Sequence, residues 1–136
     1  MAIDYGRVRT GLAVTDPMRI IATALATVET PRVMQYIKDY CTREEVDLFV
    51  VGEARQMDGT PSESMQYIEP FVAALREAFP GRDVARVDER FTSKIAFQTM
   101  IDSGLKKKQR RDKGMIDQIA ATVMLQDFMN SQNNRR

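Results

Sequence analysis

Acidic residues stand where apolar stretches of this chain end, or inside an apolar helical segment: Asp4, Glu53, Asp88, Glu89 and Asp117. Asp4, for example, directly follows Met1-Ala2-Ile3. The chain has no histidine and a single cysteine, Cys41, for which we expect a plain packing role. Any chemistry must therefore depend on carboxylates, hydroxyls, cations and the metal ions that they bind.

Carboxylates gathered in one place repel each other unless they take up protons or bind cations. Oxygen ligands favour Mg²⁺ or Mn²⁺, and a zinc or copper site is disfavoured without histidine or a cysteine cluster. Two such ions would activate water and stabilise the leaving oxygen in phosphodiester hydrolysis. A strand-end acid can equally form a turn or favour a helix start, so Asp4 and Asp88-Glu89 stay ambiguous when taken singly. Asp117 adjoins the apolar helical face of Ile116 and Ile119, where an unpaired carboxylate would be costly.

The length of 136 residues and the hydrophobic fraction of 43% fit one globular core. We therefore expect a single domain over residues 1–136. There is no apolar run of membrane-spanning length and no secretion-signal pattern, which favours a cytoplasmic protein. The net charge of +1 conceals a strongly basic stretch: Lys106, Lys107, Lys108, Arg110, Arg111 and Lys113.

Periodicity predicts an α/β domain with a mixed five-stranded sheet flanked by helices. A three-stranded N-terminal meander is expected over residues 2–5, 11–15 and 20–28, and two parallel strands over 48–51 and 84–88. Helices are expected to open at Thr30-Pro31, at the capping box Thr60-Pro61-Ser62-Glu63, at Thr92 or Ser93, and at about Lys113. The carboxyl ends of parallel strands meet at one edge, so the acids should converge there.

Cationic and hydroxyl side chains are expected around the same edge and could hold phosphates, although exposed arginines are also ordinary surface residues. The basic stretch directly precedes the helix that carries Asp117, so it would border the acidic site. The predicted nucleic-acid contacts outside that stretch are Arg7, Arg9, Thr10, Arg55 and Arg90.

Several motifs, in order along nearly the whole chain, resemble the YqgF family of bacterial proteins, also called RuvX or Holliday junction resolvase-like proteins. The motifs are Ala2-Ile3-Asp4-Tyr5-Gly6, Arg9-Thr10-Gly11, Val50-Val51-Gly52, Met57-Asp58-Gly59-Thr60, Asp88-Glu89-Arg90-Phe91-Thr92-Ser93 and Asp117-Gln118-Ile119-Ala120-Ala121. The resemblance implies a ribonuclease H-like fold and a nuclease dependent on Mg²⁺ or Mn²⁺, with Asp4, Glu89 and Asp117 as its acidic centre. It also implies two roles, processing of the 5′ end of precursor 16S rRNA, which we favour, and resolution of four-way DNA junctions.

Two departures from the family pattern leave alternatives open. Glu53 stands where relatives usually have leucine, and it is either an additional metal ligand or the partner of a cation such as Arg55. The chain also starts only three residues before Asp4, so its first strand is shorter than expected. A non-catalytic nucleic-acid-binding module remains a second class of function, and the protein could be a monomer or a homodimer. The length argues against an actin-like or sugar-kinase ATPase, which needs two copies of the fold.

Overall fold

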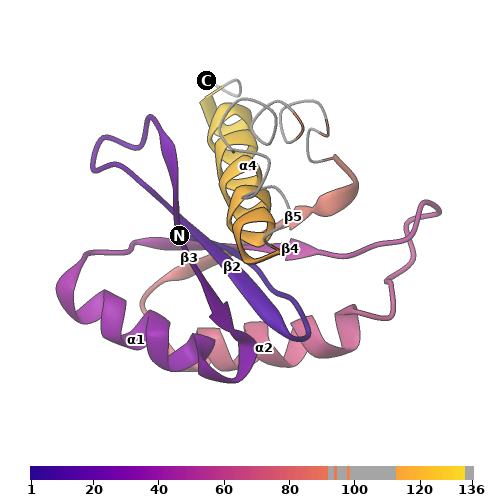
Figure 1. Cartoon of the computed structure of the whole chain (residues 1–136), viewed down its shortest axis with the longest axis horizontal. Helices are drawn as coiled ribbons and strands as arrows, with labels where there is room; N and C mark the ends of the chain where they lie inside the picture. The colour runs from indigo at the N-terminus through magenta and orange to yellow at the C-terminus, as the bar shows by residue number, and fades with distance from the viewer. Residues whose placement is uncertain (92–93, 95–97, 99–112, 134–136) are drawn as a thin grey trace.

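A mixed five-stranded sheet forms the centre of the molecule (Figure 1). The computed structural model of this chain describes residues 1–91, 94, 98 and 113–133. Strands β1 (Ala2–Asp4), β2 (Arg9–Thr15) and β3 (Ala22–Glu29) form an antiparallel meander, and β4 (Leu48–Glu53) and β5 (Asp83–Asp88) run parallel to β1. The strand order is β3-β2-β1-β4-β5. The predicted meander with two parallel strands is confirmed.

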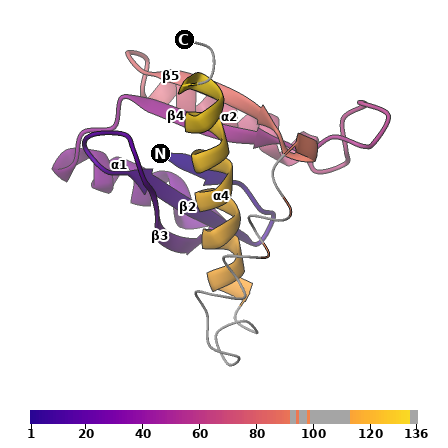
Figure 2. The ribbon, with the colours of Figure 1, turned by 90° about the horizontal axis from the view of Figure 1, so that it is seen from above.

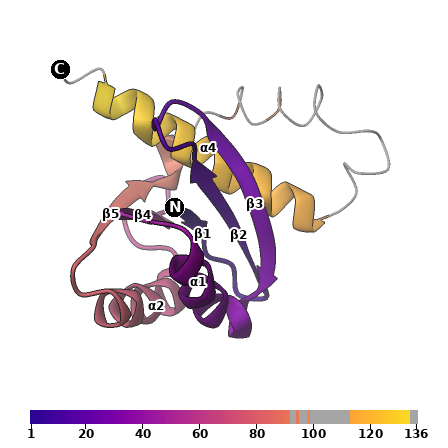
Figure 3. The ribbon, with the colours of Figure 1, turned by 90° about the vertical axis from the view of Figure 1, so that its left-hand side faces the viewer.

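Helices cover both faces of this sheet (Figure 3). Helices α1 (Val33–Arg43) and α2 (Met65–Ala78) lie side by side on one face. Helix α4 (Lys113–Asn133) crosses the other face, with the strands behind it in Figure 2. Two short 3-10 helices, η1 (Thr30–Arg32) and η2 (Glu89–Phe91), follow β3 and β5. No helix in the described part of the chain is long and apolar enough to cross a membrane.

The alternation of side chains along the strands divides the core into two layers. Larger residues such as Ile3, Leu12 and Phe49 pack toward α1 and α2. Smaller ones, including Ala2 and Ala13, face α4 with Val50. Alanines on this second face allow α4 to lie close to β1 and β2, which brings the residues of its first turns near the sheet edge.

The prediction that a helix opens at Thr60-Pro61 is wrong, because α2 begins only at Met65. Residues 55–61 instead form a hairpin, in which Arg55 and Pro61 make an isolated β-bridge. The Thr60 amide and hydroxyl both donate to the Asp58 carboxylate, at 2.9 and 2.7 Å. These local hydrogen bonds use the groups that a capping box would need.

Thr30 also differs from its predicted role as a helix cap. It begins η1, and α1 follows from Val33. The Thr30 hydroxyl lies 2.6 Å from the Gly6 carbonyl oxygen, to which it donates, and 2.9 Å from the Thr10 hydroxyl. Thr30 therefore fastens the turn between β1 and β2. The helix start predicted at Thr92 or Ser93 lies outside the described residues, as do Lys106, Lys107, Lys108, Arg110 and Arg111.

Candidate active site

Asp4 and Glu89 meet at the carboxyl ends of the parallel strands. Asp4 ends β1, and Glu89 directly follows β5 at the start of η2. Strand β4 lies between β1 and β5, and its residue Gly52 faces the Glu89 side chain. A Cβ atom at Gly52 would lie 2.4 Å from Oε1 of Glu89. Glycine at this position therefore makes the room in which the Glu89 carboxylate forms a hydrogen bond with Asp4.

Asp117 reaches the same edge from the opposite layer, on α4. A Cβ atom at Gly11 of β2 would lie only 2.0 Å from the Asp117 carbonyl oxygen. Only glycine permits this close approach of α4 to β2. A Cβ atom at position 11 would meet the backbone of α4, which cannot turn aside as a flexible side chain can. The Asp117 carboxylate accepts a hydrogen bond from Arg9, whose Nε lies 3.0 Å from Oδ2. Arg9 thus fixes the side chain and partly neutralises its charge.

The electrostatics of the site centre on Asp4. The pKa of the Asp4 carboxyl is raised from 3.8 to about 8, mainly by burial and in addition by the neighbouring carboxylates of Glu89 and Asp117. Without a cation nearby, Asp4 therefore holds a proton at neutral pH and can donate a hydrogen bond to Glu89. Such a carboxyl is stabilised in its charged form by a bound cation.

The donor set fits a hard divalent ion, because carboxylate oxygens are brought together and one of these groups, Asp4, has its pKa raised by burial and by its acidic neighbours. Within residues 1–91, 94, 98 and 113–133, no three acidic or thiol side chains already stand at metal-binding spacing. The Asp117 carboxylate is hydrogen-bonded to Arg9 instead. Asp4, Glu89 and Asp117 are the residues that would hold the metal.

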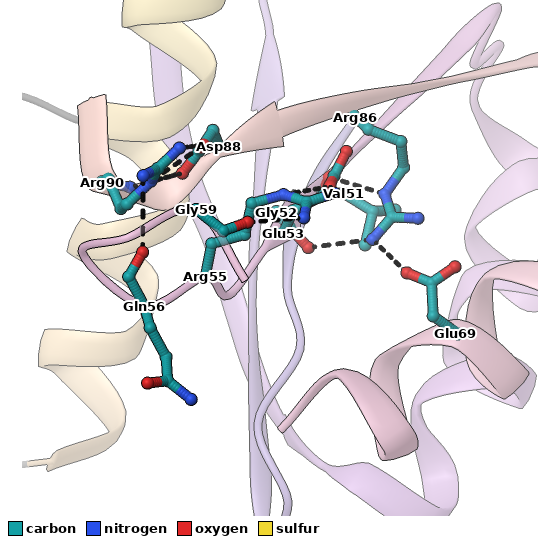
Figure 4. Close-up of polar contacts among 10 residues, drawn as sticks. All are labelled: Val51, Gly52, Glu53, Arg55, Gln56, Gly59, Glu69, Arg86, Asp88 and Arg90. Carbon is teal, nitrogen blue, oxygen red and sulfur yellow. Dashed lines mark hydrogen bonds and ion pairs between the residues drawn. The ribbon is translucent and has the colours of Figure 1, made fainter. Parts of the chain in front are cut away.

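Glu53 and Asp88 are engaged in ion pairs close by (Figure 4). Oε2 of Glu53 accepts a hydrogen bond from Arg55 Nε at 2.9 Å. Arg90 donates to both Asp88 oxygens, and its Nη1 reaches the Met57 carbonyl oxygen at 3.3 Å. The Arg90 guanidinium lowers the pKa of Asp88. The sequence left two roles open for Glu53, a metal ligand or the partner of a cation such as Arg55. The structure shows the pairing with Arg55, and the role of Glu53 as a metal ligand stays a prediction.

The predicted phosphate contacts have different surroundings. Arg7 is exposed, and its guanidinium carbon lies 4.9 Å from the centroid of the Tyr67 ring. Arg9 is held by Asp117, and Arg55 and Arg90 border the hairpin beside Glu53. Thr10 is fully buried and its hydroxyl contacts Thr30, so it holds the turn rather than facing solvent. Lys113 begins α4.

A larger cavity lies away from these carboxylates. It has a volume of about 760 Å³ and lies at the opposite end of β1, lined by Met1, Thr15, Leu48 and Phe128 among others. Polar residues that perturb one another's protonation are a better indication of chemistry than cavity size alone. We therefore assign the candidate active site to the carboxylate edge.

The site residues that sequence reasoning missed are the two glycines. Gly11 and Gly52 were noted only as parts of motifs, although each gives space to an acid on another element. A glycine just before a strand-end acid was the available signal for Gly52. No local signal connected Gly11 with Asp117, because 106 positions separate them in the sequence.

The strand order, the helices on both faces and the acids at the strand ends define a ribonuclease H-like α/β protein. The family model described as RuvX, Holliday junction resolvase, matches residues 1–131. The chain therefore belongs to the RuvX family.

Curated relatives align with this chain over nearly their whole length. A protein of Flavobacterium johnsoniae is 55% identical over 131 residues, which cover 96% of this chain and 95% of the relative. Proteins of Parabacteroides distasonis and Porphyromonas gingivalis are 50% and 47% identical over 131 residues, covering 96% of this chain and 94% and 95% of the relatives. All three carry the name "Putative pre-16S rRNA nuclease".

Proposed function

We propose that this protein is a nuclease dependent on Mg²⁺ or Mn²⁺, with two ions bound, that hydrolyses a phosphodiester bond at the 5′ end of precursor 16S rRNA in the cytoplasm. The observation that carries the proposal is the shared position of Asp4, Glu89 and Asp117: burial, together with the two neighbouring acids, raises the pKa of Asp4 to about 8. Half-buried acids brought together with no catalytic or binding role would be an unexplained cost to the fold. The names of the relatives support the substrate.

The chain's own residues account for orientation and charge. Asp4 and Glu89 would hold the metal from the sheet, and Asp117 would hold it from α4 on the other layer. When bound, divalent ions supply Lewis-acid stabilisation of the transition-state charge and an activated water. Arg9 keeps the Asp117 side chain in place, and exposed Arg7 offers a phosphate contact on the turn directly after Asp4.

Resolution of four-way DNA junctions is the second candidate function, favoured by the description of the matching family. Cutting both strands of a junction requires two active sites, which a homodimer would provide, whereas trimming an RNA end requires one. Purified protein should be incubated in parallel with precursor 16S RNA and with a four-way junction, each with Mg²⁺ or Mn²⁺. Preference for the RNA supports the first function, and preference for the junction supports the second.

Asp4→Asn is the matched control for catalysis. The amide keeps the shape of the side chain but cannot bind a divalent ion as a carboxylate does, so we expect cleavage to fall at least about 100-fold. Cleavage that remains at the wild-type rate with either metal would exclude Asp4 from the reaction. Binding that falls steeply with salt, without cleavage of either substrate, would instead indicate a binding module.

A further inference from the structure

A small cavity lies beyond the carboxyl end of β1, between the β1–β2 turn and the start of α2. Its volume is about 180 Å³. Its walls come from Tyr5, Gly6, Arg7, Ser64, Tyr67 and Ile68. Tyr5 and Gly6 directly follow Asp4 in the sequence, so this wall of the cavity continues from the end of β1 that carries Asp4.

The turn that forms one wall is fixed from several sides. The Tyr5 ring stacks on Phe71 of α2, with ring centroids 4.6 Å apart. The Gly6 carbonyl oxygen accepts a hydrogen bond from Thr30, and a Cβ atom at Gly6 would lie 2.1 Å from the Arg9 carbonyl oxygen. The cavity is therefore formed before any ligand binds, which lowers the entropy cost of binding.

The chemistry of the walls suits one nucleotide. Tyr67 keeps 36% of its surface exposed, and the Arg7 guanidinium lies over its ring. Proteins that bind single strands combine aromatic or arginine planes, on which bases stack, with cations that hold the backbone phosphate. Glu63 also lines the cavity and disfavours a second phosphate there, while its carboxylate can accept a hydrogen bond from a base.

We propose that this cavity binds one unpaired nucleotide next to the phosphodiester that is cut. A paired and stacked base cannot present its face to Tyr67, so the substrate must be single-stranded or opened at this position. The inference rests on the proposed nuclease function and narrows its substrate class to nucleic acids with an unpaired segment beside the cleavage site.

Binding without catalysis tests the inference. Two RNA probes are needed: a blunt duplex, and the same duplex with a single-stranded 5′ extension. Fluorescence anisotropy in EDTA measures the affinity for each. The wild type should prefer the extended probe by at least about fivefold, since stacking one base on an aromatic ring typically contributes that much or more. The variant Tyr67→Ala should lose this preference while its affinity for the blunt duplex stays unchanged.

Two matched variants control for surface and folding effects. Tyr67→Phe keeps the ring and should keep the preference. Val8→Ala alters a 66% exposed apolar residue of the same turn that does not line the cavity, and it should also behave as wild type. A preference that survives in Tyr67→Ala, or an equal loss of affinity for both probes, would overturn the inference.

Cleavage assays keep this test separate from that of the proposed function. A wild-type protein that prefers the extended probe through Tyr67 but cleaves nothing with Mg²⁺ or Mn²⁺ would overturn the nuclease function alone. A protein that cleaves precursor RNA but shows no preference dependent on Tyr67 would overturn the cavity assignment alone.

Discussion

Replacing Asp4 with asparagine should stabilise the metal-free protein at neutral pH. The pKa of Asp4 is raised from 3.8 to about 8, mainly by burial, so the folded state resists ionisation that the unfolded chain undergoes freely. The resulting loss of folding stability is absent below the pKa of the unfolded chain. It grows as pH rises above 3.8 and is complete above about 8. The variant Asp4→Asn carries no ionisable group and escapes it.

The pKa shift sets the size of the effect. At pH 7 the solution is about 3 pH units above the unfolded pKa of Asp4. This corresponds to a loss of folding free energy of at most about 4 kcal/mol. For a domain of this size that is a rise in Tm of at most roughly 15 °C. Thermal unfolding in EDTA should show this difference at pH 7, a larger one at pH 8 and almost none at pH 4.

Added metal should favour the wild type over Asp4→Asn in thermal stability. A divalent ion that binds only the folded protein stabilises it by mass action, so Mg²⁺ should raise the Tm of the wild type and leave that of Asp4→Asn nearly unchanged. A Tm difference that does not vary between pH 4 and pH 8, or an Asp4→Asn variant less stable than the wild type at pH 8, would refute the reasoning. Asp4 would then not be a destabilising buried acid.

The two site glycines should respond differently to alanine. In Gly52→Ala the new methyl group meets Oε1, Cγ and Cδ of Glu89, a flexible side chain that can rotate away. We expect stability within about 1 kcal/mol of wild type but cleavage reduced at least about tenfold; full activity would show that Glu89 need not lie there. In Gly11→Ala the methyl group meets α4 backbone, so denaturant unfolding should show a loss of about 1–3 kcal/mol. Unchanged stability would contradict the close approach of α4 to β2.

The sequence by itself determined the fold class and the positions of the acids along the strands. The pattern of apolar residues and the turn-forming residues between them predicted the meander and both parallel strands. These signals are local in the sequence, and the packing of the folded chain agrees with them. The same patterns misplaced the start of α2. Thr60-Pro61-Ser62-Glu63 has the residue types of a capping box. In the structure, however, the Thr60 amide donates to the Asp58 carboxylate instead.

Only the tertiary structure decided how the acids relate to one another. Glu89 lies beside Asp4 because β4 separates their strands and contributes a residue without a side chain, Gly52. Asp117 approaches because Gly11 admits the backbone of α4, and Arg9 then orients its carboxylate. These contacts join residues up to 108 positions apart. The sequence specifies which groups are available for chemistry, but their distances and charges depend on packing between elements, which no local pattern records.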